Sequence, residues 1–346
     1  MRDVLSAIDQ WQAAGQAVAV ATVVQTWGSS PRQAGAKMAL TPRGDLAGSV
    51  SGGCIEGAVF EAGVEALTSQ HGHLLHFGVA DETAWEVGLA CGGSIDVFVQ
   101  PLAADYYATV KAAIARNGEF AVLTVVAGPQ IGQQVVVDAA GVQWTNLDPA
   151  LAEAAVGLAQ TALAEGRSQR QPLGDAMQSI AGEAFVEVVL PPPTLVAVGG
   201  VHITIALVAL AKTLGYRTVV VDPRKAFGNE LRFPPGSVDQ LVQLWPDEAL
   251  AEIPLTRGTA VAMLTHDPKL DDPALKLALP SAAFYVGALG SKTTQAKRRQ
   301  RLLDDGLTPA DVDRLHGPIG LPLNAGTPEE IALAIMAEIV KVRNGG

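Results

Sequence analysis

The second part of the chain alternates short apolar runs with longer stretches of helical periodicity, and this alternation restricts the possible folds more than any other feature. Apolar runs rich in β-branched residues predict strands at 195–198, 218–222, 240–244, 260–265 and 283–287. A helix is expected from residue 203 to residue 214, with Gly215 as its C-cap. Continuous apolar strands that alternate with helices predict a Rossmann-like, doubly wound parallel sheet.

The first part of the chain mixes strands and helices without this regularity. Strands are expected at 18–24, 37–41, 96–100, 121–126, 134–137 and 184–190, and helices at the N-terminus, 56–67 and 150–164. Gly44 and Asp45 indicate a hairpin turn. A run of three prolines, 191–193, separates the two patterns. A chain of 346 residues favours two domains, so we expect a mixed α/β domain over 1–190 and a Rossmann-like domain over 191–346.

Composition excludes several classes of partner. The net charge of −11 disfavours nucleic acid and anionic membranes, which need clustered Lys and Arg. Residues 188–211 carry no formal charge, but prolines and the pair Gly199-Gly200 interrupt them, so a strand, turn and helix fit better than a membrane span. The N-terminus does not resemble a signal peptide, and a cytoplasmic protein is expected.

Two cysteines form neither a disulfide scaffold nor a four-thiolate zinc site, and no metal site is predicted.

Both cysteines are framed by glycines. The sequence reads Ser-Gly-Gly-Cys-Ile-Glu at 51–56 and Ala-Cys-Gly-Gly at 90–93, and a Gly-Ser-Ser-Pro-Arg loop at 28–32 lies upstream. Glycine lets the backbone approach a ligand closely, and a thiolate just before a helix is stabilised by the helix dipole. Cys54 is therefore the candidate soft ligand or sulfur carrier. The alternative, a small buried hydrophobic residue, is favoured for Cys91, so replacing Cys91 is expected to matter less.

The first turn of the Rossmann-like half resembles a dinucleotide-binding turn only in part. Gly199 is present, and an acid, Asp222, ends the second strand, but Val201 and Thr204 stand where G-x-G-x-x-G has glycines. Tight NAD(P) binding is therefore not expected.

The ends of the strands place polar groups together. If the strand order is the usual one, His202 after the first strand and His266 and Asp267 after the fourth meet in one crevice, with Asp222 and Arg224 on its rim.

A further glycine turn follows the fifth strand. Gly290, Ser291 and Lys292 open a helix whose free amides suit a phosphate. Residues 297–299, Lys-Arg-Arg, are expected on a solvated basic face. At 327–330, Thr-Pro-Glu-Glu predicts a capping box.

Together these segments resemble the XdhC/CoxI family of xanthine dehydrogenase accessory proteins, over nearly the whole chain. The runs that carry the resemblance are 28–32, 51–56, 222–224, 232–234, 265–267, 285–287, 289–292, 318–321 and 327–332. The family pattern Gly-Ala-Gly-His-Val-Gly is replaced here by residues 199–204, which keep His202 and lose two glycines.

The resemblance implies a maturation factor that binds the molybdenum cofactor while its terminal sulfur is installed and delivers it to an apo molybdenum hydroxylase. It also implies a cysteine desulfurase and a second copy of the chain as partners. Two alternatives remain open: a nicotinamide-dependent oxidoreductase, and a persulfide sulfurtransferase that uses Cys54.

We expect the cofactor site to draw on both domains. Besides Cys54, the candidate cofactor-binding residues are Ser29, Ser30, Arg32, Gly52, Gly53, Gly199, His202, Asp222, Arg224, His266, Asp267, Gly290, Ser291 and Lys292.

Overall fold

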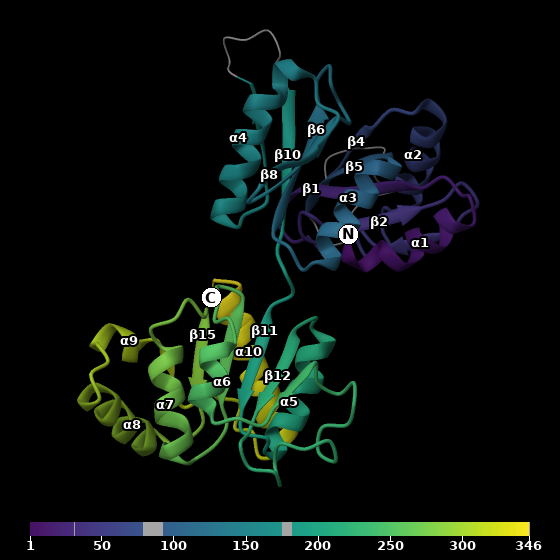
Figure 1. Ribbon diagram of the computed structural model, residues 1–346. Helices are drawn as coiled ribbons and strands as arrows, with labels where there is room; N and C mark the ends of the chain where they lie inside the picture. The colour runs from purple at the N-terminus through teal and green to yellow at the C-terminus, as the bar shows by residue number, and fades with distance from the viewer. Residues whose placement is uncertain (31, 79–92, 175–181, 346) are drawn as a thin grey trace. The chain divides into compact units, whose positions relative to one another are not determined.

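The computed structural model describes residues 1–30, 32–78, 93–174 and 182–345 (Figure 1). The chain divides into two compact units, Met1–Pro191 and Pro192–Gly346. Each unit is described below by itself.

The first unit begins with an antiparallel sheet of order β3-β2-β1-β5-β4. Its elements are η1 (Arg2–Val4), α1 (Leu5–Ala13), β1 (Ala19–Trp27), β2 (Lys37–Leu40), β3 (Leu46–Gly48), α2 (Glu56–Ser69), β4 (His73–Phe77) and β5 (Ser94–Pro101). Helix α2 covers one face, where Val59 packs with Ala21 and Val97 of the strands. Val4 and Ile8 of the N-terminal helices pack with strand residues in a second apolar cluster.

A second antiparallel sheet follows, of order β8-β7-β6-β10-β9. Its elements are α3 (Ala104–Ala115), β6 (Phe120–Ala127), β7 (Gln134–Asp138), β8 (Gly141–Thr145), α4 (Pro149–Glu165), β9 (Gln169–Leu173) and β10 (Gly182–Val189). The alanine-rich side of α4 packs on this sheet through Ala155 and Ala159. The two sheets meet through one apolar cluster, to which the first contributes Val24 and Phe98 and the second Phe185.

The second unit contains a parallel six-stranded sheet of order β13-β12-β11-β14-β15-β16. Its elements are β11 (Thr194–Val198), α5 (His202–Thr213), β12 (Arg217–Val221), β13 (Gln240–Val242), α6 (Pro246–Glu252), β14 (Thr259–Met263), α7 (Pro268–Ala278), β15 (Tyr285–Ala288), α8 (Lys292–Asp304), α9 (Pro309–Asp313), β16 (Leu315–His316) and α10 (Pro328–Arg343). Helices α5 and α10 share one apolar core with the sheet, and α6 to α9 share the other (Figure 1). The predicted doubly wound parallel sheet is confirmed.

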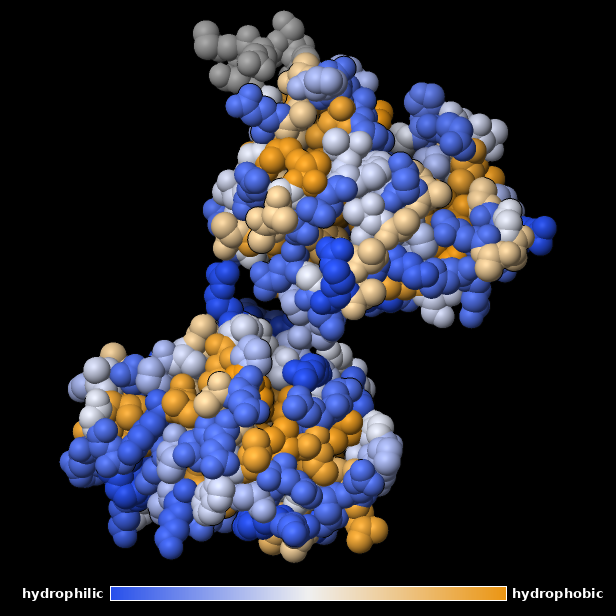
Figure 2. Space-filling model, in the orientation of Figure 1, coloured by the Kyte–Doolittle hydropathy of each residue, from blue (hydrophilic) through white to orange (hydrophobic). Residues whose placement is uncertain are grey.

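Local predictions are confirmed as well. The uncharged stretch 188–211 forms the end of β10, then β11, a glycine turn and α5. Within the described ranges no helix has the length and apolarity needed to cross a membrane. Thr327 caps α10 in a capping box with Glu330, and Pro328 occupies the first turn. On the face seen in Figure 2, hydrophilic and hydrophobic residues are interspersed over both units.

Candidate functional site

The loop that carries Cys54 is held together by one carboxylate. Glu56, the first residue of α2, folds back so that its Oε1 accepts hydrogen bonds from the amides of Ser51 (2.9 Å) and Gly52 (3.1 Å). Its Oε2 accepts from the Ser51 hydroxyl (2.5 Å) and the Gly53 amide (2.8 Å). The hydroxyl of Ser49 adds a further bond at 2.7 Å. Successive amides can converge on one anion here because Gly52 and Gly53 have positive φ angles of 89° and 124°.

This arrangement decides what the loop offers a ligand. The amides of Gly52 and Gly53 are engaged by Glu56, so a phosphate would bind them only if it displaced that carboxylate. The thiol of Cys54 is exposed and is not part of a disulfide, while its amide donates to the Ser51 hydroxyl at 3.2 Å. The loop therefore presents a thiol from a backbone that the chain itself has fixed.

Glu56 is ionised in this setting. Burial alone would raise its pKa, but hydrogen bonds from the hydroxyls of Ser51 and Ser49 and from the backbone outweigh burial and lower the pKa to about 2. Because this value lies below that of an unfolded glutamate, near 4.5, the carboxylate contributes stability above about pH 4.5. That contribution is lost as the pH falls toward about 2.

We predict that Glu56→Gln lowers the free energy of unfolding of the first unit by about 1–3 kcal/mol at pH 7, because glutamine has an NH2 donor in place of one acceptor oxygen and loses the negative charge that the loop amides and hydroxyls bind. The difference from wild type should shrink as the pH falls from about 4.5 toward 2. Urea unfolding at several pH values measures both effects. Glu61→Gln, at an exposed position of the same helix, is the control. Equal stability of Glu56→Gln and wild type at pH 7 would contradict the role given to this carboxylate.

The loop at 28–32 lies at the end of β1. Ser29 is exposed, and the Ser30 hydroxyl donates to the carbonyl of Arg32 at 2.8 Å. The guanidinium of Arg32 lies 3.8 Å from Asp3, and its side chain is 38% exposed. Gly93, the last residue of the second glycine-framed motif, lies against this loop: a Cβ there would come within 2.4 Å of the Ser29 carbonyl oxygen. Cys91 lies outside the described residues.

The second unit brings the predicted crevice residues to one edge of its sheet. Strands β11 and β14 are neighbours with Val198 opposite Met263, so His202 and His266 follow adjacent strand ends, as predicted. Both histidines are exposed. Asp267 is exposed and caps α7 by accepting from the Lys269 amide at 3.0 Å.

Asp222 is fully buried and holds the glycine turn. Its carboxylate accepts from the Gly200 amide at 2.8 Å and from the guanidinium of Arg224 at 2.7 and 2.9 Å. Burial alone would raise the pKa of Asp222, but Arg224 and the amides hold it below its usual range. Gly200 is also enclosed: its carbonyl accepts from Arg232 at 2.9 Å, and a Cβ would come within 2.3 Å of the Phe227 carbonyl oxygen.

We predict that the chain does not bind NAD or NADP with sub-micromolar affinity. The acid that would bind the ribose hydroxyls in a dinucleotide site is used internally by Gly200 and Arg224. Val201 and Thr204 occupy positions that a pyrophosphate turn gives to glycine. Calorimetric titration with both dinucleotides is the measurement, and a dissociation constant below one micromolar would revive the oxidoreductase alternative.

The turn after β15 is ordered by its own residues. The hydroxyl of Ser291 caps α8 by accepting from the Thr294 amide at 3.2 Å, and Gly290 has a φ of 137°. Lys292 is exposed at the first position of the helix. These residues lie together at a helix N-terminus, where an anion is favoured.

The prediction of a solvated face for the basic run on α8 is wrong for Arg298. Hydrophilic residues line the outer side of α8 in Figure 2, but the Arg298 side chain is 2% exposed and its Nη2 lies 2.8 Å from Asp271. Its Nη1 donates to the Gln295 side chain at 2.7 Å, and the hydroxyl of Thr265 donates to Asp271. Burial raises the pKa of Asp271, against the opposing effects of Thr265 and Arg298.

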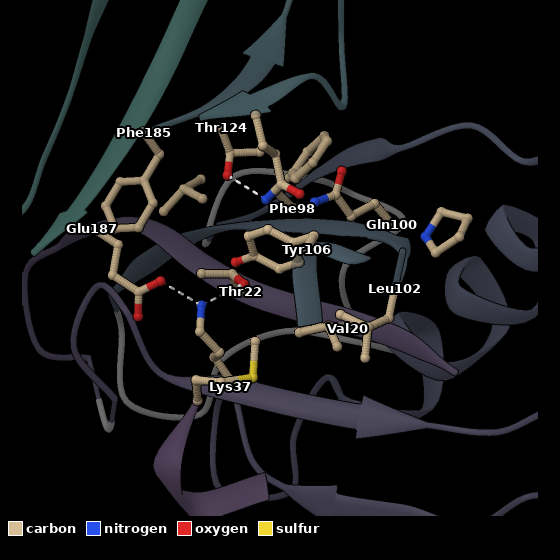
Figure 3. Close-up of a pocket in the computed structure, with 14 residues that line it drawn as sticks. Val20, Thr22, Lys37, Phe98, Gln100, Leu102, Tyr106, Thr124, Phe185 and Glu187 are labelled. Atoms are coloured by element: carbon tan, nitrogen blue, oxygen red, sulfur yellow. Dashed lines mark hydrogen bonds and ion pairs between the residues drawn. The ribbon is translucent and has the colours of Figure 1, made fainter. Parts of the chain in front are cut away.

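A small cavity lies between the two sheets of the first unit (Figure 3). It is lined by the buried ion pair of Lys37 and Glu187, whose charged atoms lie 2.8 Å apart, and by Thr124, which accepts from Gln134 at 2.9 Å. The cavity leaves about 20 Å³ for the centres of water molecules, which suits about one water. It therefore does not accommodate a cofactor.

No group of three or more His, Cys, Asp or Glu that could hold a metal ion occurs within 1–30, 32–78, 93–174 and 182–345. The part of the chain that the structure describes thus offers one exposed thiol on a fixed loop and, elsewhere in the same unit, Ser29, Ser30 and Arg32. In the second unit it offers the exposed His202 and His266 after neighbouring strand ends. That these groups serve one ligand stays a prediction.

Comparisons with known proteins place these features in a family. A model described as the XdhC Rossmann domain matches residues 195–339, and a model of the XdhC and CoxI family matches residues 11–78, together more than half of the chain. The description of the first model, a Rossmann domain, agrees with the parallel sheet of the second unit. The chain belongs to the XdhC and CoxI family.

Similar proteins extend over nearly the full length. A probable xanthine dehydrogenase subunit of Bacillus subtilis is 26% identical over 94% of this chain and 92% of its own. "Molybdenum cofactor insertion chaperone PaoD" of Escherichia coli is 24% identical over 95% of this chain and 84% of its own. The crystal structure of a xanthine dehydrogenase from Bacillus halodurans superposes with a TM-score of 0.75 at 22% identity, covering 99% of this chain and 96% of that one. This last likeness is one of fold.

Proposed function

We propose that this chain binds the molybdenum cofactor, supports the installation of its terminal sulfur and delivers it to a molybdenum hydroxylase of the xanthine dehydrogenase type. The observation that carries the proposal is the similarity, over 95% of the chain, to a protein named as a molybdenum cofactor insertion chaperone. The relative from Bacillus subtilis, named for xanthine dehydrogenase, supports the class of client.

The donor set of the first unit suits this cofactor. When bound, the cofactor supplies a molybdenum centre on a pterin dithiolene with a phosphate tail. Cys54 offers an exposed sulfur, a soft ligand, directly before α2. Arg32 is more than one-third exposed, and its partner Asp3 lies at 3.8 Å, so its guanidinium can turn to a phosphate.

Residues of the second unit contribute to the same proposal. His202 and His266 are exposed at neighbouring strand ends, and Gly290, Ser291 and Lys292 form a helix N-terminus that favours an anion. Asp222 is not part of the proposed ligand-binding set. Its carboxylate accepts from the Gly200 amide and thereby fixes the glycine turn. A persulfide on Cys54 would make the chain a sulfur carrier within the same role, with a cysteine desulfurase as its sulfur source. A second copy of the chain belongs to the proposal as its expected partner.

The test is to purify the full chain from a host that makes the molybdenum cofactor and from a host that does not. Molybdenum is measured by mass spectrometry, and the pterin by fluorescence after oxidation. We expect both to accompany the protein from the first host in similar molar amounts and neither from the second. Protein from the first host without molybdenum and without pterin would refute cofactor binding.

A further inference from the structure

An open groove in the first unit lies where the two antiparallel sheets meet, and none of the roles described so far uses it. The groove has a volume of about 370 Å³ and is lined from one sheet by Gln25, Trp27 and Asp96 and from the other by Arg170 and Glu183. It lies one residue from the loop at 28–32, because Trp27 is the last residue of β1.

The volume of the groove falls within the range of small-molecule sites, and Trp27 gives its lining an aromatic ring. Trp27 is 47% exposed, although tryptophan usually buries most of its large apolar ring. An exposed indole is a stacking platform for a heterocycle, since every such ring has a π-face.

The floor of the groove is fixed by charged groups from both sheets. His76, Asp96 and Gln25 lie directly opposite one another on the neighbouring strands β4, β5 and β1. Asp96, whose side chain is 8% exposed, binds His76 Nδ1 at 2.5 Å and Arg170. Arg170 also binds Oε2 of Glu183, so both carboxylates are held in place by one guanidinium.

Polar side chains among the residues that line the groove keep hydrogen-bonding capacity. Within the described parts of the chain, Oε1 of Glu183 and the side-chain amides of Gln25 and Gln171 have no hydrogen-bond partner. The half-exposed carboxylate of Glu183 can accept from N–H groups on one edge of a ring, and the side-chain NH2 groups of the glutamines can donate to a carbonyl of the same ring. These groups match the amide and amino edge of a 2-amino-4-oxopyrimidine.

We infer that this groove binds a planar nitrogen heterocycle with a 2-amino-4-oxo edge, stacked on Trp27 and read by Glu183. Two sources share this chemistry: a pterin and a guanine base. The pterin source rests on the proposed function, because a pterin is the heterocycle of the molybdenum cofactor.

The test titrates the full chain with neopterin, guanosine and adenosine by calorimetry. We expect neopterin or guanosine to bind and adenosine, which lacks the edge, to bind at least about tenfold more weakly. Trp27→Ala should weaken binding at least about tenfold, since stacking is lost. Trp245→Ala, which removes an indole of similar exposure (49%) from the second unit, should leave affinity unchanged. Glu183→Gln should reduce the preference over adenosine.

The possible results distinguish a pterin from a guanine base, and they distinguish a failure of this inference from a failure of the proposed function. Preferential binding of neopterin assigns the groove to a pterin, and preferential binding of guanosine assigns it to a guanine base. Lack of binding by both, or equal binding by Trp27→Ala with an unchanged thermal transition, overturns the inference. If wild-type and Trp27→Ala proteins carry equal molybdenum from a cofactor-producing host, the pterin assignment fails while the proposed function stands. If wild-type protein carries no molybdenum and no pterin, the proposed function fails. The titrations with free neopterin and guanosine then still test whether the groove binds a heterocycle.

Discussion

Replacing Cys54 with serine is expected to reduce activation of a molybdenum hydroxylase at least about tenfold, because in the proposed function its sulfur binds the cofactor, and loss of a ligand should cost no less than loss of an outer-shell group. The change keeps the side-chain volume nearly constant and removes the soft sulfur from an exposed position. The loop itself should persist, since its hydrogen bonds run to Glu56 and Ser51 and not to the thiol. Client activity after reconstitution with the variant, and molybdenum retained by the variant, are the two measurements.

Cys91→Ser is the matched control for this experiment, because it makes the same chemical change at the other cysteine. We expect it to activate the client nearly as well as wild type does. Full activation by Cys54→Ser with unchanged molybdenum would show that this thiol has no part in the function. Loss of activation by Cys91→Ser alone would move the sulfur chemistry to that residue.

Replacing Arg298 with methionine should cost about 3–5 kcal/mol of stability in the second unit, the range for removing one partner of a buried ion pair. Asp271 is fully buried, so the variant leaves a carboxylate whose remaining partner is Thr265. Denaturant unfolding followed by circular dichroism measures the loss.

Two variants make that result specific. Arg299→Met removes the neighbouring guanidinium, whose ion pair with Asp313 is exposed on both sides, and should change stability by less than about 1 kcal/mol. The double variant Arg298→Met with Asp271→Leu removes the stranded charge and should regain much of the loss. Equal stability of Arg298→Met and Arg299→Met would contradict the buried pair.

The sequence predicted the second unit far better than the first. In a parallel sheet both faces are covered, so strands such as 195–198 are continuously apolar and easily recognised. The first unit has short edge strands whose residues are largely exposed or half-buried, and of these β4, β8 and β9 were not predicted. The edge strand β3 pairs with β2 across the hairpin turn expected at Gly44 and Asp45. Helix α3 was missed as well, although its tyrosines and valine face two apolar clusters.

For the candidate site, the sequence predicted which residues take part better than it predicted the hydrogen bonds and ion pairs that hold them. The adjacency of His202 and His266 followed from strand order alone. The position of Glu56 in the first helical turn, directly after a glycine-rich loop, could have indicated a carboxylate that binds the loop amides. No local pattern relates Asp271 to Arg298, because they lie on different helices and meet only in the folded unit.

The Cys54 loop has a consequence for protein engineering. All of its stabilising bonds to Glu56 lie within residues 49–56, so the information that shapes it is contiguous in the chain. Such a segment can be transplanted: inserted between a strand and a helix of an unrelated protein, it should keep its backbone geometry and present a single exposed thiol at a defined position.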